Sequence, residues 1–164
     1  MSHFPSTKGL RSFLASRRTN TWYSPVMKLT PGEIQQLEQA ARGAASAAYC
    51  PYSNFPVGAA VLTGSGKMYV GCNVENAAFG LCNCAERTAL FTAAAAGERQ
   101  VTAVAIYTPT RTATAPCGAC RQVLNEFGAD ALVISVCDSA ERSERRLSDL
   151  LPAAFGPANL KPAS

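Results

Sequence analysis

The spacing of apolar residues predicts a helix over residues 31–49. Within this segment apolar side chains recur at helical spacing, at Ile34, Leu37, Ala41, Ala44, Ala45 and Ala48. Thr30 and Glu33 have the spacing of a capping box, in which each side chain satisfies a free backbone N–H at the helix start. Pro51 follows closely, and the residue before a proline disfavours helical geometry, so the helix is expected to end there.

Four short apolar runs farther along the chain predict strands, at 57–62, 68–73, 101–107 and 131–136. Gly64 and Gly66 lie between the first two runs and indicate a turn, so these strands are expected to form a hairpin. Two further helices, each closed by a glycine, are expected at 84–96 and 117–127. The charged segment 138–146 can hold an edge strand, and a short helical turn is expected at 147–151.

This order of helices and strands predicts the α/β fold class. Strands that form continuous apolar runs are buried on both faces, so helices should cover the sheet from both sides. We therefore expect a three-layer α/β/α architecture with a mixed five-stranded sheet. At 164 residues the chain is expected to form one domain, over 29–164, preceded by an extension over 1–28.

Charge is unevenly distributed along the chain. The formal net charge is +4, but residues 1–28 hold five Lys or Arg and no acidic residue, which leaves ten basic and eleven acidic groups in the remainder. The domain therefore lacks the basic excess typical of nucleic-acid binding, which favours a small-molecule substrate. All apolar runs are shorter than the roughly 18 residues needed to span a bilayer, so no membrane partner is expected.

The N-terminal extension and the cysteine content bear on localisation. Residues 1–28 are rich in Ser and Arg and free of acid, a composition shared by organelle transit peptides and disordered tails. Seven cysteines, an odd number, without a secretory signal segment fit a reducing compartment. A cytoplasmic location is therefore expected, with a mitochondrial location as the alternative if residues 1–28 act as a transit peptide.

Two cysteine segments carry the candidate chemistry. Cys84 lies at the expected start of one helix, and Cys117 and Cys120 share a face at the start of another. The positive end of a helix dipole stabilises thiolates at such positions. Three thiolates leave one coordination position of Zn²⁺ open, which is typical of a catalytic site. Glu86, two residues after Cys84, is then a candidate proton carrier and not a ligand.

Three thiolates on one Zn²⁺ carry excess negative charge, which neighbouring cations would offset. Arg87 and Arg121 are each adjacent to a cysteine segment and are candidate donors to the sulfurs. A Cys-x-x-Cys pair also fits a redox pair or half of a structural zinc site, to which Cys82 could supply a fourth ligand. Otherwise the remaining cysteines are interpreted as packed structural residues: Cys50, Cys72, Cys82 and Cys137.

Five sequence blocks match one family together. Two contain the cysteines: Cys84-Ala85-Glu86-Arg87-Thr88 and Pro116-Cys117-Gly118-Ala119-Cys120-Arg121-Gln122-Val123. Three more are Phe55-Pro56-Val57-Gly58-Ala59-Ala60, Asn73-Val74-Glu75-Asn76 and Leu150-Leu151-Pro152-Ala153-Ala154-Phe155. With these blocks the chain resembles the homotetrameric, zinc-dependent nucleoside cytidine deaminases. Relatives that act on nucleotides or nucleic acid usually have His at the position of Cys84, so the cysteine favours the free-nucleoside branch.

The resemblance implies an activity and a cofactor. Cys84, Cys117 and Cys120 would hold one Zn²⁺ per subunit. Glu86 would take a proton from water, pass it to N3 of cytosine and then deliver a proton to the departing amino group. Cytidine and deoxycytidine would yield uridine and deoxyuridine with release of ammonia, as in pyrimidine salvage, and the family pattern accepts both substrates.

The resemblance also implies how a nucleoside is bound. Asn73 and Glu75 resemble the family's ribose-binding pair, and Phe55 resembles the aromatic residue that lines the pyrimidine pocket. Backbone groups of Ala85 and Glu86 would contact the edge of the base. Phe155 resembles a C-terminal Phe that reaches the site of a neighbouring subunit in the homotetramer.

Other interpretations of these residues are less specific. Without the resemblance, Asn73 and Glu75 fit the polar groups of a turn, and an isolated Phe usually packs in a core. Phe79 departs from the family, since relatives often carry Tyr there. Rival functions are deamination of an altered aminopyrimidine nucleoside, a non-catalytic zinc-binding module, and polynucleotide deamination, which the near-neutral domain charge disfavours.

Overall fold

The computed structural model describes residues 29–160, which are organised around one mixed β-sheet. Its strand order is β2-β1-β3-β4-β5. The strands are β1 (Gly58–Thr63), β2 (Met68–Cys72), β3 (Val101–Tyr107), β4 (Leu132–Val136) and β5 (Arg142–Arg146). Strands β3 and β4 pair in parallel, whereas β1 pairs antiparallel with β2 and β3, and β5 pairs antiparallel with β4. The mixed five-stranded sheet confirms the expected fold class.

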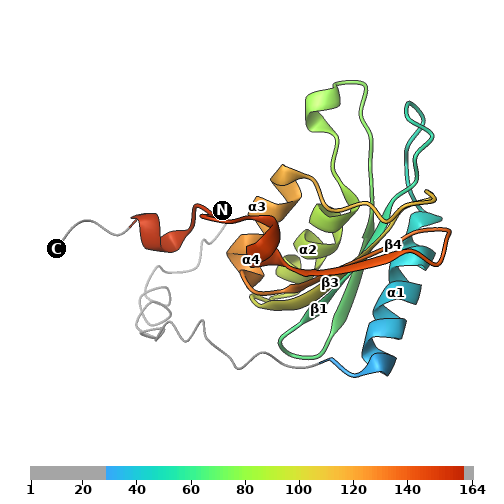
Figure 1. Ribbon diagram of the computed structural model, residues 1–164. Coiled ribbons are helices and arrows are strands. Elements are labelled where there is room, and N and C mark those ends of the chain that lie inside the picture. Colours follow the sequence, from blue (N-terminus) through green and yellow to red (C-terminus); the bar gives the residue numbers. More distant parts are fainter. Residues whose placement is uncertain (1–28, 161–164) are drawn as a thin grey trace, which may run out of the picture.

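Helices cover both faces of the sheet, so the domain has three layers (Figure 1). The α-helices are α1 (Pro31–Ala45), α2 (Ala85–Ala95), α3 (Gly118–Gly128) and α4 (Leu147–Leu150). Alternate residues of β1 enter different cores, since Ala60 packs with α1 whereas Ala59 and Val61 pack with α2 and α3. This two-sided burial explains why the strand has no polar alternation. None of the helices within residues 29–160 has the length and apolarity needed to cross a lipid bilayer.

The first helix begins as predicted but ends earlier. Its capping box is formed, because the Thr30 N–H donates to Glu33 Oε2 (2.8 Å) and the Glu33 N–H donates to Thr30 Oγ1 (3.2 Å). The helix ends at Ala45, and the prediction that it extends to residue 49 was wrong. The reason is that Tyr49 pairs with the segment after β2: its N–H donates to Asn73 O (3.0 Å), and its carbonyl accepts from the Glu75 N–H (2.8 Å).

The other predicted helices and strands lie within one residue of the observed bounds, and β5 occupies the second half of the charged segment 138–146. Two short 3₁₀ turns were not predicted, at Phe79–Leu81 and Pro157–Leu160. The first interrupts the long connection between β2 and α2, and Figure 1 shows it projecting from the body of the domain. The second lies in the extended C-terminal segment.

Strand directions bring the starts of α2 and α3 to the same edge of the sheet. Since β2 and β3 both run antiparallel to β1, they run parallel to each other. Helix α2 follows β2 and helix α3 follows β3, so both helices begin beyond the carboxyl ends of these strands. In open α/β sheets this edge is where ligand sites form.

A glycine sets the height of α2 above the sheet. A Cβ atom at Gly71 of β2 would lie 2.2 Å from the backbone N of Ala89, which is closer than any real contact. Glycine at this position therefore allows the backbones of β2 and α2 to approach directly. The start of α2, with Cys84 and Glu86, is held in place by this contact.

Candidate zinc and catalytic site

Three cysteine sulfurs converge at the shared edge of the sheet. Cys84 is the N-cap residue of α2, Cys117 is the N-cap residue of α3, and Cys120 lies in the first turn of α3. Their Sγ atoms all lie within 4.8 Å of one another. Sulfurs bound to one tetrahedral zinc at about 2.3 Å lie about 3.8 Å apart, so this spacing fits a single ion. The all-sulfur donor set also fits zinc.

The sulfur cluster favours thiolate formation at Cys84. Hydrogen bonding from Cys120, with smaller contributions from Arg87, lowers the pKa of Cys84 to about 5, although burial acts in the opposite direction. The same close pairing raises the pKa of Cys120. One sulfur thus readily becomes anionic, and a cation among the three would be needed to hold all of them as thiolates.

The two arginines expected beside the sulfurs have different contacts. Arg87 Nη2 donates to the carbonyl of Cys82 (2.9 Å) and to Cys84 Sγ (3.8 Å), so its charge lies against the cluster. Arg121 instead donates from Nε to Pro116 O (2.7 Å) and from Nη1 to Leu150 O (2.8 Å). These bonds tie the loop before α3 to the end of α4. The sequence had instead suggested that Arg121 would donate to a cysteine sulfur.

Glu86 is almost fully buried next to the cluster, with 4% of its surface exposed. Burial raises the pKa of its carboxyl, and the negative charge of Cys84 acts in the same direction. Both effects make this carboxyl easier to protonate than an ordinary surface carboxylate. A carboxyl of this kind can hold a proton and release it within the site.

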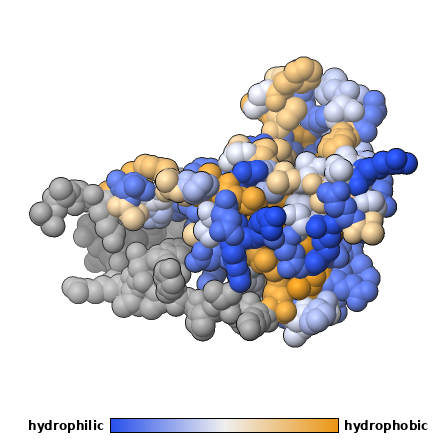
Figure 2. All heavy atoms as spheres, in the orientation of Figure 1, coloured by the Kyte–Doolittle hydropathy of each residue, from blue (hydrophilic) through white to orange (hydrophobic). Residues whose placement is uncertain are grey.

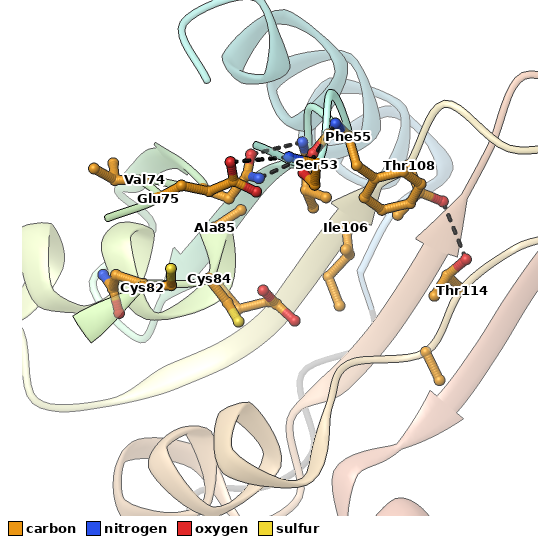
Figure 3. A pocket seen from close by; sticks show the side chains of 15 residues that line it. Ser53, Phe55, Val74, Glu75, Cys82, Cys84, Ala85, Ile106, Thr108 and Thr114 are labelled. Atoms are coloured by element: carbon orange, nitrogen blue, oxygen red, sulfur yellow. Dashed lines mark hydrogen bonds between the residues drawn. The ribbon is translucent and has the colours of Figure 1, made fainter. Parts of the chain in front are cut away.

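A cavity of about 410 Å³ opens beside Glu86 (Figure 3). Ligand pockets commonly have volumes of this order. The sequence-predicted residues that line it are Phe55, Asn73, Glu75, Cys84, Ala85 and Glu86. They come from the loop before β1, the segment after β2 and the start of α2. The fold therefore gathers in one cavity residues from three segments that lie apart in the sequence.

Asn73 and Glu75 also organise the loop that forms one wall of this cavity. Asn73 Oδ1 accepts from the Val57 N–H (2.8 Å), and its Nδ2 donates to Phe55 O (2.9 Å). Glu75 Oε2 accepts from the backbone N–H groups of Tyr52 (2.9 Å) and Ser53 (3.2 Å). Hydrogen bonding by Ser53 lowers the pKa of Glu75, so its carboxylate stays charged. The second lone pair and second amide hydrogen of Asn73 are left for other partners.

Phe155 and Cys82, two further residues considered in the sequence analysis, differ in how they lie relative to the cavity. Phe155 is 58% exposed and is not among the residues that line the cavity of its own chain. Its carbonyl accepts from Gln122 Nε2 (2.9 Å), which fixes the C-terminal segment to α3. Cys82 lines the cavity and is not packed in the core, and within residues 29–160 it is not a member of the sulfur cluster.

Several lining residues were missed by the sequence interpretation, namely Ser53, Val57, Val74, Asn83, Ile106, Thr108, Thr114 and Ala115. Ile106 lies at the carboxyl end of β3 and Thr108 directly follows that strand, so the edge rule for parallel strands could have indicated them. Thr114 lies in a threonine-rich loop for which the sequence alone suggested no role.

Comparison with known proteins places the chain in a family. Residues 31–136 match the family described as cytidine and deoxycytidylate deaminase zinc-binding region. The chain therefore belongs to the zinc-binding cytidine and deoxycytidylate deaminase family, a family of hydrolytic enzymes.

Individual relatives agree with this membership. A cytidine deaminase of Sporosarcina psychrophila is 41% identical over 133 residues, which cover 80% of this chain and 98% of the relative. A cytidine deaminase of Halalkalibacterium halodurans is 48% identical over 122 residues, covering 74% and 92%. The crystal structure of cytidine deaminase from Burkholderia pseudomallei superimposes with a TM-score of 0.72 at 49% identity, covering 77% of this chain and all of that one.

Proposed function

We propose that this protein catalyses the hydrolytic deamination of cytidine and deoxycytidine to uridine and deoxyuridine. The observation that carries the proposal is the buried carboxyl of Glu86 beside three converging cysteine sulfurs, in a cavity that also contains Asn73 and Glu75. The names of the relatives support the same reaction. Water is consumed, the C4–N bond of the base is broken, a C4–O bond is formed, and ammonia leaves.

Cys84, Cys117 and Cys120 would hold one zinc ion per chain. When bound, the zinc ion supplies Lewis acidity, which makes a water molecule nucleophilic near neutral pH. Glu86 accepts a proton from that water and passes it to N3 of the base, which makes C4 more electrophilic. Glu86 later delivers a proton to the departing amino group. Its burial keeps bulk water away from these proton transfers.

The remaining lining residues orient the nucleoside. Asn73 and Glu75 bind the sugar hydroxyls with the hydrogen-bonding capacity that their contacts to the loop leave free. Phe55, which is 37% exposed and lines the cavity, packs against the pyrimidine ring. Backbone groups at Ala85 and Glu86, at the start of α2, contact the edge of the base. Arg87 reduces the negative charge of the sulfur cluster.

The direct test measures the loss of cytidine absorbance and the release of ammonia by the purified full chain, with zinc content determined on the same sample. Turnover that disappears on chelation and returns with zinc is expected. One zinc per chain without turnover of cytidine or deoxycytidine would contradict the proposal. Turnover of an altered aminopyrimidine nucleoside in that case would identify the closest rival, and no ammonia from any nucleoside would favour a non-catalytic zinc module.

We further propose that the chain forms a homotetramer whose sites are completed across subunits. The supporting observation is a set of large apolar side chains that are more than half exposed: Tyr49, Tyr52, Phe79, Leu81, Phe155 and Leu160. Tyr52 and Phe79 meet edge to face, with ring centroids 5.9 Å apart. Figure 2 shows apolar surface on the projecting part of the domain. Exposed apolar surface of this kind is typical of interfaces. Light scattering would measure the mass of the assembly directly.

We also propose that residues 29–164 form the catalytic domain and that the protein is located in the cytoplasm. All seven cysteines are free, which fits a reducing compartment. Residues 1–28, the possible transit segment, lie outside the described residues. Fluorescent fusions of the full chain and of residues 29–164 would separate cytoplasmic from mitochondrial location. The same truncated chain should retain zinc and activity if the domain boundary is right.

A further inference from the structure

The segment after α4, residues 151–160, carries a large apolar side chain that a single chain leaves uncovered. Phe155 is 58% exposed and does not line the cavity of its own chain. Figure 1 shows this segment (red) extending away from the sheet. A loosely held phenylalanine loses backbone and rotamer freedom when it binds a partner, which weakens the binding. Phe155 can therefore serve an interface well only if its segment is already held in place.

The backbone at Phe155 is held by two amide side chains of α3. Gln122 Nε2 donates to the Phe155 carbonyl (2.9 Å), and Asn125 Nδ2 lies 3.4 Å from the same oxygen. Gln122 and Asn125 are three residues apart, so they lie on one face of the helix. A carbonyl oxygen has two lone pairs, and these two contacts use both. Gln122 is the stronger anchor, because its contact has the ordinary length of an N–H···O bond.

The chain on either side of Phe155 is also held by hydrogen bonds. Before it, the carbonyl of Leu150 accepts from Arg121 Nη1 (2.8 Å). After it, the Gly156 N–H donates to Asn159 Oδ1 (2.8 Å), and the Asn159 N–H donates to Gly156 O (2.9 Å), which closes a turn. The segment thus has a defined course along α3, while the ring of Phe155 stays exposed.

Helix α3 fixes this anchor relative to the proposed zinc site. Its N-cap residue is Cys117, and its first turn contains Cys120, two of the three residues whose sulfurs converge. Gln122 follows Cys120 by two residues on the same helix. The helix that begins at the sulfur cluster of one chain therefore also determines where that chain presents Phe155.

We propose that Gln122 is a positioning residue that acts on the site of a neighbouring copy of this chain, by holding Phe155 where its ring covers the nucleoside bound there. This inference rests on the proposed function and on the proposed homotetramer. Because Phe155 does not line its own cavity, loss of the Gln122 bond should leave the catalytic groups of the same chain intact. The defect should appear in the neighbouring chain that receives the ring. A contact made equally to substrate and transition state changes KM and leaves kcat nearly unchanged.

The variant Gln122→Met tests this anchor directly. It keeps the length of the unbranched side chain and removes both N–H donors. KM for cytidine should rise by roughly threefold, as expected for one neutral hydrogen bond, while kcat and zinc content stay close to wild type. The double variant Gln122→Met, Asn125→Leu removes both anchors and should raise KM by roughly tenfold.

The matched control is Glu126→Met on the same helix. Glu126 is exposed and, in the part of the chain that the structure describes, makes no hydrogen bond to residues 151–160. Its KM for cytidine should equal that of the wild type. Unfolding temperatures of all variants should also match the wild type, since the substituted side chains are not in the hydrophobic core.

Mixed assemblies separate this role from a local structural one. In assemblies with a large excess of Glu86→Gln chains, which should not turn over substrate, the active sites belong to Gln122→Met chains. Phe155 reaches those sites from chains with an intact Gln122, so KM should return to the wild-type value. Wild-type chains in a large excess of Glu86→Gln, Gln122→Met chains should instead show the raised KM. A local defect would follow the active chain in both arrangements.

The outcomes separate this inference from the function on which it rests. A wild-type KM in both Gln122→Met and the double variant overturns the role of Gln122 alone, as does a KM that follows the active chain in mixed assemblies. A wild type that turns over cytidine but is monomeric by light scattering does the same. If the zinc-loaded wild type turns over neither cytidine nor deoxycytidine, the proposed function and the role of Gln122 are both overturned.

Discussion

Two parts of the molecule differ in how complete they are within one chain. One is the cluster of Cys84, Glu86, Cys117 and Cys120, called the floor here because Cys84 and Glu86 line the cavity. The other is the exposed apolar segments, represented by Phe79, Leu81, Phe155 and Leu160. On the floor, Cys120 and Glu86 are buried and two helix starts meet. The four side chains of the apolar segments are 58–72% exposed. Secondary structure and sheet topology alone can assemble the floor. The apolar segments, in contrast, gain stability only when a partner covers them.

Replacement of a proposed zinc ligand should have the largest effect on the floor. Cys117→Ser removes one sulfur at an exposed position, so little packing is lost with it. Zinc should be lost from the purified protein, because only two of the three sulfurs remain to hold the ion. Zinc stoichiometry and thermal unfolding with and without chelator measure the effect.

Cys72→Ser is the matched control for this substitution. The Cys72 thiol donates to Ala47 O (3.2 Å), a bond that serine can also make, and Cys72 is not in the sulfur cluster. Zinc should be retained at the wild-type level. Equal zinc loss in both variants would mean that the three-sulfur cluster is not the binding site.

Glu86→Gln should be nearly as damaging to turnover while leaving the metal in place. The amide cannot carry a proton, so kcat should fall by at least 10²–10⁴-fold, the usual contribution of general acid–base catalysis. Zinc content and unfolding temperature should stay close to wild type. Glu126→Gln, on the exposed side of α3, is the control with unchanged turnover. Full activity in Glu86→Gln would remove Glu86 from the proton-transfer role.

The sequence predicted the features that depend on local patterns, and it missed features that depend on contacts between distant segments. The helices, the strands and the meeting of Cys84 with Cys117 follow from local patterns, because capping, apolar periodicity and strand direction act over short distances or obey general rules. The early end of α1 was missed, since it depends on the pairing of Tyr49 with Asn73, a contact between distant segments. For the same reason the contacts of Arg121 with Pro116 and Leu150 were not foreseen.

A substitution in the exposed apolar segments should affect activity without affecting zinc. Phe155→Ala should lower kcat/KM for cytidine by roughly tenfold and weaken assembly, as expected when one buried aromatic anchor is lost at an interface. Phe155→Leu keeps an apolar side chain and should retain most of the activity. Light scattering and kinetics on the same samples provide the two readouts. Wild-type kinetics and mass in Phe155→Ala would mean that no neighbouring site uses this residue.

The smallest effect is expected at Ala153, two residues before Phe155. Ala153 has a φ of 53°, in the left-handed region that an alanine side chain disfavours. Ala153→Gly should therefore stabilise the folded chain by about 0.5–1 kcal/mol, because glycine enters this region without steric cost. Chemical denaturation would measure the gain, while zinc content stays unchanged.

Asn54 provides the matched control for this strain. It has the same φ of 53°, but asparagine enters the left-handed region with less cost than alanine, so Asn54→Gly should give a smaller gain. Equal gains at the two positions would mean that the backbone of Ala153 is not specially strained. A larger gain at Ala153 would indicate that the segment carrying Phe155 accepts local strain within one chain, which contacts with a neighbouring subunit can offset.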